Sequence, residues 1–358
     1  MSDPVDGIHF RVFLTLPMKS ASSLNFPENA PLPFSAAGTG PAIPGRCPFF
    51  SVITVCLNAE KVIPAALSSL LGQTFTDWEW VVVDGASIDS TTEIIRSLTA
   101  GDPRVSLSSG PDGGIYQAMN KGVRRARGEF LYFLNADDAL AGPDILEEVA
   151  KGLQSSGGCD FLYGDILAVG ADGTSGRFQP PPPENLLDIF VAGCLPHQGC
   201  FQNRALFGDD RIGLFDESYR ISADYLWMMS VAATPGIRIQ YLPKVIASYD
   251  MSGLSSHLEK CLPESHRALN GHTAFLKAIG AERLREGYQL QLMAVRIELE
   301  KMRKAYAGEK NKKEKLKEKL ADAVQRREAM KAALQAEKRR RGRRGLWGRL
   351  KCWIQPQT

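Results

Sequence analysis

The chain has 358 residues, of which 44% are apolar and 23% charged, which is enough for one large domain or two moderate ones. No apolar run approaches the roughly 18 residues of a membrane-spanning helix, and Asp3 and Asp6 stand where a secretory leader would carry basic residues. The seven scattered cysteines show neither zinc-site spacing nor a disulfide framework, so we expect reduced thiols in a cytoplasmic setting.

The net charge of +3 is spread unevenly, and composition divides the chain into four segments. Residues 1–48 are rich in Pro, Ser, Ala and Gly and predict a weakly structured segment, whereas residues 49–280 have a globular composition. Residues 281–337 have a charged helical pattern, and residues 338–358 hold a dense basic cluster. We expect only the globular segment to carry chemistry.

The globular segment begins with alternating strands and helices. Phe49–Leu57 is short, β-branched and bounded by a proline and an asparagine, which predicts a buried strand. Ala59–Leu71 has apolar residues at helical spacing, and Trp78–Val83 predicts a second buried strand. Another helix is expected to begin near Asp89. Strands that alternate with helices in this way predict a parallel sheet.

The alternation continues along the next part of the chain. Arg104–Ser108 predicts a third strand, Ile115–Ala126 a helix and Glu129–Leu134 a fourth strand. We therefore predict an α/β fold with a mostly parallel, Rossmann-like sheet. Neither GxGxxG nor GxxxxGK[ST] occurs, which argues against ordinary dinucleotide and P-loop sites.

Acidic residues follow two of the predicted strands. Asp84 comes after the second strand, and Asp137 and Asp138 come after the fourth. Ligands of open α/β sheets bind at the carboxyl ends of strands, and carboxylates suit Mg²⁺ or Mn²⁺ held together with substrate phosphates. By themselves, Asn-Ala-Asp-Asp and Asp112–Gly114 are also compatible with plain polar turns. The recurrence of acids at one sheet edge favours a ligand site.

Four blocks between Phe49 and Ser256 resemble the family 2 glycosyltransferases. In chain order they are SVITVCLNAE at 51–60, WEWVVVDGASIDST at 78–91, DGGIYQAMNKGVRRARGEFLYFLNADD at 112–138, and PHQGCFQNRALF with FDESYRISADYLWMM within 196–229. The third block is similar to bacterial members that assemble exopolysaccharides, including the colanic-acid branch. The resemblance implies the nucleotide-sugar-binding GT-A fold and metal-dependent, inverting sugar transfer.

The resemblance also implies a metal site at the paired acids. Asp137 and Asp138 correspond to its D-x-D-like element, with Asp138 as metal ligand and Asp137 as ribose or metal contact. Asn135 stands where many relatives have another acid. We therefore expect fewer protein ligands and more water and diphosphate oxygens around the Mg²⁺ or Mn²⁺ ion.

Further donor-binding residues follow from the same resemblance. It implies that Asp84 contacts the nucleoside, that Lys121 reaches the diphosphate or sugar, and that Asn58 and Asp112 complete the donor side. Gln117 stands where near relatives often have aspartate, so no acidic role is expected there.

Asp224, in Ser-Ala-Asp, matches the acid that serves as catalytic base in the family. We expect its basicity to be raised by desolvation, because Tyr225 and Trp227 follow closely. The alternative is that Asp224 only caps a helix, a common use of aspartate at such a place.

Two more features resemble parts of the cleft. His197 and Gln198 match residues on the acceptor or diphosphate side, although a lone histidine is as often structural. The stretch Tyr249–Ser255 resembles a loop that closes over the donor, and an ordinary surface loop would look the same.

The C-terminal part predicts an extension of the enzyme. A broken heptad pattern runs from Tyr288 to Leu334 and predicts a coiled coil that joins two subunits, with a single solvated helix as the alternative. Residues 338–354 mix Lys and Arg with Trp and Leu, which is typical of a segment on an anionic membrane surface. Nucleic-acid binding is not expected, since base-stacking aromatics usually lie on a folded platform.

Together these observations predict an enzyme of surface-polysaccharide assembly. We expect it to transfer sugar from a nucleotide sugar to a glycan or lipid-linked acceptor, as a peripheral protein at the inner face of the plasma membrane. The alternatives are a non-catalytic sugar-nucleotide-binding scaffold organised by the coiled coil, and a nucleotidyltransferase, which would lack the block around Asp224. The donor sugar, base, acceptor and linkage are not predicted.

Overall fold

The computed structural model describes residues 47–155, 158–170, 175–250, 258–289, 292–293, 296 and 313–342. Most of the N-terminal segment, most of the predicted donor loop after Asp250, and the basic tail beyond Gly342 lie outside the described residues. The chain divides into two compact units, each of which is described by itself. The larger contains the described residues up to Phe190 and from Cys194 to Ala278, and the smaller contains residues 191–193 and those from Ile279 onward.

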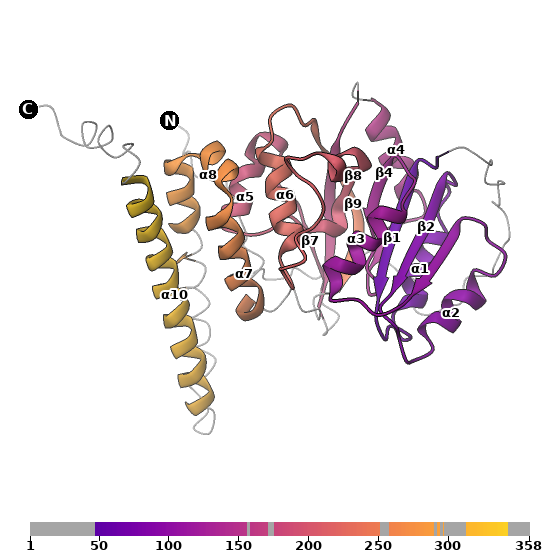
Figure 1. Cartoon of the computed structure of the whole chain (residues 1–358), viewed down its shortest axis with the longest axis horizontal. Coiled ribbons are helices and arrows are strands. Elements are labelled where there is room, and N and C mark those ends of the chain that lie inside the picture. The colour runs from indigo at the N-terminus through magenta and orange to yellow at the C-terminus, as the bar shows by residue number, and fades with distance from the viewer. Residues whose placement is uncertain are drawn as a thin grey trace, which may run out of the picture. The chain divides into compact units, whose positions relative to one another are not determined.

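The first half of the larger unit has the predicted alternation of strands and helices (Figure 1). In chain order its elements are β1 (Phe50–Cys56), α1 (Ile63–Leu71), β2 (Trp78–Asp84), α2 (Thr91–Leu98), β3 (Val105–Ser109), α3 (Ile115–Arg125) and β4 (Phe130–Phe133). The pairs β1–β2, β1–β4 and β2–β3 are all parallel. The predicted parallel arrangement is therefore correct for this half of the sheet.

The second half of the sheet differs from the prediction. It contains β5 (Ala139–Leu140), β6 (Phe161–Val169), β7 (Ser175–Phe178), β8 (Cys200–Asn203) and β9 (Ile239–Asp250), and the sheet order is β3-β2-β1-β4-β8-β6-β9-β5, with β7 beside β6. The pairs β4–β8, β6–β8, β6–β7 and β5–β9 are antiparallel, whereas β6–β9 is parallel. The sheet is therefore mixed rather than mostly parallel, because β8 pairs antiparallel with both β4 and β6 and so joins the two halves.

Buried strands form the core that fixes the site. Phe50 in β1, Trp80 in β2, Tyr132 in β4 and Phe201 in β8 are all fully buried. The rings of Tyr132 and Phe201 stack at 4.4 Å, which joins the parallel half to the antiparallel half. Burial of side chains of this size stabilises the fold by roughly 1.5–3 kcal/mol each.

One glycine lets α3 approach the sheet closely. A Cβ atom at Gly122 would lie 2.5 Å from Ile53 Cγ2, so any larger residue would push α3 away from β1. The helix packs on β1 and β2 (Figure 1). This close packing fixes the position of the side chains that α3 contributes to the site.

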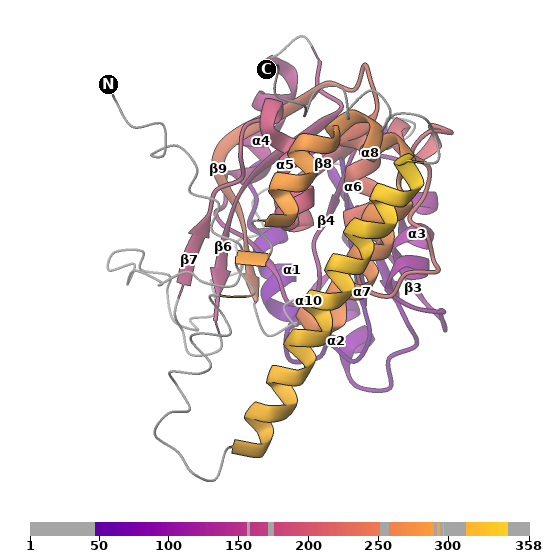
Figure 2. The same cartoon turned by 90° about the vertical axis from the view of Figure 1, so that its left-hand side faces the viewer.

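Helices complete the larger unit around the second half of the sheet. They include α4 (Ile145–Ser155), α5 (Leu186–Ala192), α6 (Ala223–Ala233), α7 (Leu258–Gly271) and α8 (Thr273–Ile279). Strand β9 separates α6 from α7 along the chain, yet α7 lies beside α6 in both views (Figures 1 and 2). The contact between α6 and α7 matters for the site, because α6 carries Asp224 in its first turn.

The smaller unit contains helical residues 281–289 and the 30-residue helix α10 (Lys313–Gly342). Among the predicted heptad positions, Met330 is buried, Ala323 and Leu334 are half-buried, and Arg327 is exposed. One helix face is thus partly covered within a single chain, and the coiled coil between two chains stays a prediction. None of the described helices is long and apolar enough to cross a bilayer.

Candidate active site

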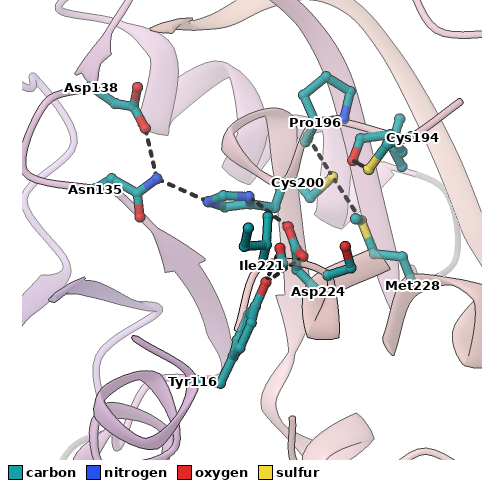
Figure 3. A network of polar contacts seen from close by, with 12 residues as sticks. Tyr116, Asn135, Asp138, Cys194, Pro196, Cys200, Ile221, Asp224 and Met228 are labelled. Carbon is teal, nitrogen blue, oxygen red and sulfur yellow. Dashed lines mark hydrogen bonds and ion pairs between the residues drawn. The ribbon is translucent and has the colours of Figure 1, made fainter. Parts of the chain in front are cut away.

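Asp224 lies in the first turn of α6 and faces two side chains from elsewhere in the larger unit. Its Oδ2 is 3.0 Å from His197 Nδ1, and its Oδ1 accepts a 2.7 Å hydrogen bond from the Tyr116 hydroxyl (Figure 3). Ser222 occupies the N-cap position of α6. The alternative that Asp224 only caps the helix is therefore wrong, since its carboxylate is directed at a histidine and a tyrosine.

His197 begins the short 3₁₀ helix η2 (His197–Gly199) and lies between two polar groups. Nδ1 faces Asp224, and Nε2 is 3.1 Å from Asn135 Nδ2. The side chains of His197 and Asp224 are each 17% exposed. The pair is thus largely shielded from water but remains accessible at one side.

The pKa values of this pair are shifted in opposite directions. Burial would raise the pKa of Asp224, but the hydrogen bond and charge of His197, together with the Tyr116 hydroxyl, lower it on balance. Burial would likewise lower the pKa of His197, but Asp224 and the nearby carboxylates raise it. The expectation of raised basicity is therefore wrong, because the partners of Asp224 outweigh desolvation. The carboxylate stays ionised and ready to accept a proton.

An apolar wall lies behind the base. A cavity of about 10 Å³, room for roughly one water, is lined by five apolar side chains and three polar ones: Met119, Phe133, Phe215, Trp227 and Met228, with His197, Gln202 and Asp224. Asp224 and His197 thus border a mostly apolar cavity just large enough for one water.

Asp138 follows β4 in a turn and is only 2% exposed. Its Oδ2 accepts a 3.0 Å hydrogen bond from Asn135 Nδ2, whereas its Oδ1 has no hydrogen-bond partner within the described part of the chain. Burial and the adjacent Asp137 raise the pKa of Asp138 to about 7, against opposing effects of His197, Asn135 and Gln198. A buried carboxylate oxygen without a partner is costly unless a ligand binds it.

The paired acids fit a divalent cation. Asp138 Oδ1 is unpaired, and Asp137, next to it, is exposed. Over the described residues no three His, Cys, Asp or Glu side chains are grouped to hold a metal ion. Carboxylate oxygens suit Mg²⁺ or Mn²⁺, which commonly take one or two protein carboxylates and complete their shell with water and phosphate oxygens.

Asp84, the last residue of β2, is fully buried and bonded within the protein. Its carboxylate accepts hydrogen bonds from Ser109 Oγ at 2.6 Å, from the Ser87 backbone N–H at 3.0 Å and from the Ser87 hydroxyl. Burial would raise the pKa of Asp84, but these bonds lower it on balance. Because the carboxylate has no exposed surface, the predicted nucleoside contact needs a shift of the loop after β2 and stays a prediction.

The other predicted donor-side residues gather around that loop. Asn58 Oδ1 accepts a 3.0 Å hydrogen bond from the Ile88 backbone N–H. A Cβ atom at Gly85 would lie 3.0 Å from Asp112 Oδ2, which brings the loop after β2 against the loop before α3. Lys121 Nζ donates a 2.9 Å hydrogen bond to the carbonyl of Pro111, directly before Asp112. The structure thus places Asn58, Asp84, Asp112 and Lys121 in one region.

Gln198 lies next to the histidine in η2 and is buried. Its backbone carbonyl accepts a 3.0 Å hydrogen bond from the Tyr132 hydroxyl of β4. The bond ties η2 to the strand that leads into Asp138, so both sides of the site rest on β4.

Tyr116 and Glu264, which were not predicted from the sequence, hold the turn before Asp224. Glu264 of α7 accepts hydrogen bonds from the backbone N–H groups of residues 220, 221 and 222, at 2.9, 2.7 and 3.1 Å. The Tyr116 hydroxyl also contacts the carbonyl oxygen of Ile221. Tyr116 belongs to a block singled out above, but nothing in the sequence marks Glu264, because its partners are backbone groups about 40 residues away.

Two further side chains of α3, Asn120 and Gln117, form hydrogen bonds with the segment that precedes α6. Asn120 Nδ2 donates 2.9 Å hydrogen bonds to Glu217 Oε1 and to the carbonyl of Phe215. Gln117 Nε2 is 3.3 Å from Glu217 Oε2, and Gln117 Oε1 accepts from the Gly113 backbone N–H at 2.6 Å. The amide of Gln117 therefore donates to one neighbour and accepts from another, which a carboxylate at this position could not do.

Fold and site together define a class of protein. Parallel strands that end in acids, continued by an antiparallel half that supplies an acid–histidine pair, form a GT-A glycosyltransferase fold. The model of the family described as glycosyl transferase family 2 matches residues 51–199. A curated relative of the same activity class is 35% identical over 80% of its length. The chain belongs to the family 2 glycosyltransferases.

Individual relatives support this assignment. The chain is similar to the PGL/p-HBAD biosynthesis glycosyltransferase of Mycobacterium bovis (strain BCG / Pasteur 1173P2), with 35% identity over 211 residues, 58% of this chain and 80% of the relative. An uncharacterized glycosyltransferase of Mycobacterium tuberculosis (strain ATCC 25618 / H37Rv) is 32% identical over 220 residues, 59% of this chain and 79% of the relative. S. aureus TarS 1-349 in complex with UDP-GlcNAc has a TM-score of 0.53 and 24% identity, covering 77% of this chain and 80% of that one.

Proposed function

We propose that this chain transfers a sugar from a nucleoside-diphosphate sugar to a hydroxyl of a glycan or lipid-linked acceptor, with inversion of configuration. One observation carries the proposal: Asp138, one of whose buried carboxylate oxygens has no hydrogen-bond partner among the described residues, is connected by its other oxygen through Asn135 and His197 to Asp224. Such an arrangement provides a place for a charged donor beside a group that can take a proton. TarS, a structural neighbour, was solved with UDP-GlcNAc, which supports a nucleotide-sugar donor here.

The donor side is assigned to the region at the ends of β1, β2 and β3. Asp84 and Asn58 shape the nucleoside end, and Asp112 and Lys121 reach toward the diphosphate and sugar. Lys121 supplies a cation next to the loop before α3, where it donates a hydrogen bond to the Pro111 carbonyl and its charge also acts on Glu217. The hydrogen bond to a neutral carbonyl can be exchanged for a stronger, charge-assisted one to a diphosphate.

Mg²⁺ or Mn²⁺ would be held by Asp138 and Asp137. When bound, the ion supplies positive charge for the diphosphate as it departs. The chain's own contribution is the buried oxygen of Asp138, whose charge a bound cation would compensate in place of a proton.

Asp224 acts as the base on the acceptor side, with His197 and Gln198 beside it. The acceptor oxygen attacks the anomeric carbon, a new carbon–oxygen bond forms, the bond to the diphosphate breaks, and the acceptor proton moves to Asp224. Asp224 lies on the opposite side of His197 from Asn135 and Asp138, which supports its assignment to the acceptor. A single base and a direct displacement give inversion, whereas retention requires a second group as nucleophile.

The cellular setting is proposed from the sequence. The basic, tryptophan-containing residues 338–358 would bind the anionic inner face of the plasma membrane, the heptads would join two subunits, and surface polysaccharide would be the product. The competing scaffold function is disfavoured, because a protein that only binds sugar nucleotides has no need for a shielded acid–histidine pair.

A screen of nucleotide sugars with Mn²⁺ and a lipid-diphosphate-sugar acceptor tests the proposal. We expect one donor to give metal-dependent, acceptor-dependent release of nucleoside diphosphate, and Asp138→Asn to stop this release. Calorimetric binding of a donor without release in the presence of any acceptor would favour the scaffold function instead.

A further inference from the structure

Asn135 connects the two acidic centres of the site. Its Nδ2 atom lies 3.0 Å from Asp138 Oδ2 and 3.1 Å from His197 Nε2 (Figure 3). An amide nitrogen carries two hydrogens and accepts none, so both contacts are donations from Asn135. With the amide in this orientation, both hydrogen bonds run from Asn135 to its neighbours.

This direction determines where His197 carries its proton. Because Nε2 accepts from Asn135, the ring proton lies on Nδ1, and Nδ1–H donates to Asp224 Oδ2 at 3.0 Å. A proton on Nε2 would face an N–H of Asn135 at hydrogen-bond distance, which is repulsive. Burial opposes a second proton on the ring, whereas Asp224, Asp138 and Asp137 favour it and raise the pKa of His197 on balance. The N–H of Asn135 that faces Nε2 opposes this second proton by its geometry.

The burial of the residues makes this arrangement effective. His197 is mostly covered, Asp138 is 2% exposed, and Asn135 is half-buried, so water competes little for these contacts. Inside such a site a hydrogen bond is stronger than in water, and groups in a chain orient one another. The amide of Asn135 therefore sets the orientation of the ring and, through the ring, that of the base.

We infer that Asn135 is a positioning residue that keeps His197 as the neutral Nδ1–H tautomer and thereby holds Asp224 in place. The role of Asp224 as base rests on the function proposed above, whereas the tautomer does not. An aspartate at position 135 would have the opposite effect, because it accepts a hydrogen bond from Nε2–H and draws a second proton onto the ring.

Nitrogen NMR of the full chain tests the tautomer without any substrate. The chain has five histidines, so ¹⁵N-histidine labelling gives few signals, and His197→Gln identifies those of His197. At pH 7.5 we expect a protonated Nδ1 and an unprotonated Nε2, and in Asn135→Asp we expect both nitrogens protonated. A protonated Nε2 with bare Nδ1 in the unmodified protein, or an unchanged spectrum in Asn135→Asp, would overturn the inference.

A matched control is available at Asn203. Its Oδ1 caps the 3₁₀ helix η3 (Arg204–Gly208) by accepting from the Ala205 backbone N–H, and aspartate is an equally good cap. Asn203→Asp therefore adds the same charge elsewhere, and we expect it to leave the His197 signals unchanged.

Turnover then tests the positioning role. With saturating donor, metal and acceptor, we expect kcat to fall about tenfold or more in Asn135→Asp, since a misplaced catalytic group commonly lowers the rate by that factor. We expect kcat to stay unchanged in Asn203→Asp. The altered tautomer with unchanged kcat would overturn the positioning role. The predicted tautomer in a protein that transfers no sugar would instead count against the proposed function alone.

Discussion

Two strand ends in the larger unit carry buried aspartates that differ in every other respect. At the end of β2, Asp84 is fully buried, and hydrogen bonds from Ser87 and Ser109 lower its pKa. In the turn after β4, Asp138 is 2% exposed, one of its oxygens has no partner in the described part of the chain, and its pKa is raised to about 7. The comparison teaches that position at a strand end does not define a ligand site, whereas unsatisfied polarity does.

The largest expected effect, a loss of both transfer and metal binding, comes from removing the charge of Asp138. Asp138→Asn should abolish metal-dependent transfer and also the stabilisation by metal. Mn²⁺ at about 100 times its Kd should raise the free energy of unfolding of the unmodified protein by about 2.7 kcal/mol. Thermal unfolding with and without Mn²⁺ measures this, and we expect no stabilisation in the variant.

The same experiment on Asp84→Asn is the control. We expect Mn²⁺ still to stabilise this variant, because the Asp84 carboxylate is bonded to serines of the protein. If both variants lost the effect of Mn²⁺, the distinction between the two strand ends would be wrong.

A smaller effect is expected at Glu264, which supports the third acid, Asp224. Glu264→Gln keeps the size of the side chain but weakens its bonds to the backbone N–H groups of residues 220–222. Transfer assays should show kcat reduced between about tenfold and a hundredfold, with the Kd of the donor unchanged, since these contacts lie on the turn before Asp224. If donor binding and kcat fell by equal factors, Glu264 would stabilise the fold as a whole and would not specifically position Asp224.

Glu282→Gln serves as the matched control for this change. The Glu282 side chain is 80% exposed and lies in the smaller unit, so we expect kcat and donor binding to stay at their original values.

The smallest expected effect is a loss of stability when Asp84 loses one of its hydrogen bonds. Ser109→Ala removes a hydrogen bond to an ionised carboxylate. We expect the free energy of unfolding at pH 7 to fall by about 1.5 kcal/mol. This is the lower end of the range for hydrogen bonds to charged groups, because Ser109 is exposed. The folded pKa of Asp84 is below its ordinary 3.8, so this stabilisation is present above that pH and disappears as the pH falls through the folded pKa. Urea unfolding over a pH series measures it.

Ser106→Ala on the same strand gives the comparison. Its hydroxyl is 3.5 Å from the uncharged carbonyl of Trp80, so we expect a smaller loss that does not depend on pH. A pH-independent loss in Ser109→Ala as well would mean that Ser109 does not act through the charge of Asp84.

Much of the first half of the fold was predictable, because its signals are local. The strands around Val52 and Val82 are continuous apolar runs, and Asp84 and Asp138 could be found as acids that end such runs. The antiparallel half depends on pairing between distant segments, such as Phe201 of β8 with Tyr132 of β4, for which the sequence carries no comparable pattern.

The charge state of Asp224 was not predictable for a related reason. The sequence neighbours of Asp224 are apolar and suggested raised basicity, yet its pKa is lowered by His197 and Tyr116, which are 27 and 108 residues away. The same holds for Glu264, which acts on backbone groups. Residue types and spacings located the site, but only the folded contacts determine its charge.

Asp224→Asn tests the central claim, that Asp224 takes the acceptor proton, most directly. Asp209, a half-buried residue paired with Arg211, is changed in the same way as the control. Donor binding by calorimetry and single-turnover transfer should be measured on the same preparation. The account predicts unchanged donor affinity and a transfer rate lowered by about 10²–10⁴; substantial turnover in Asp224→Asn would contradict it.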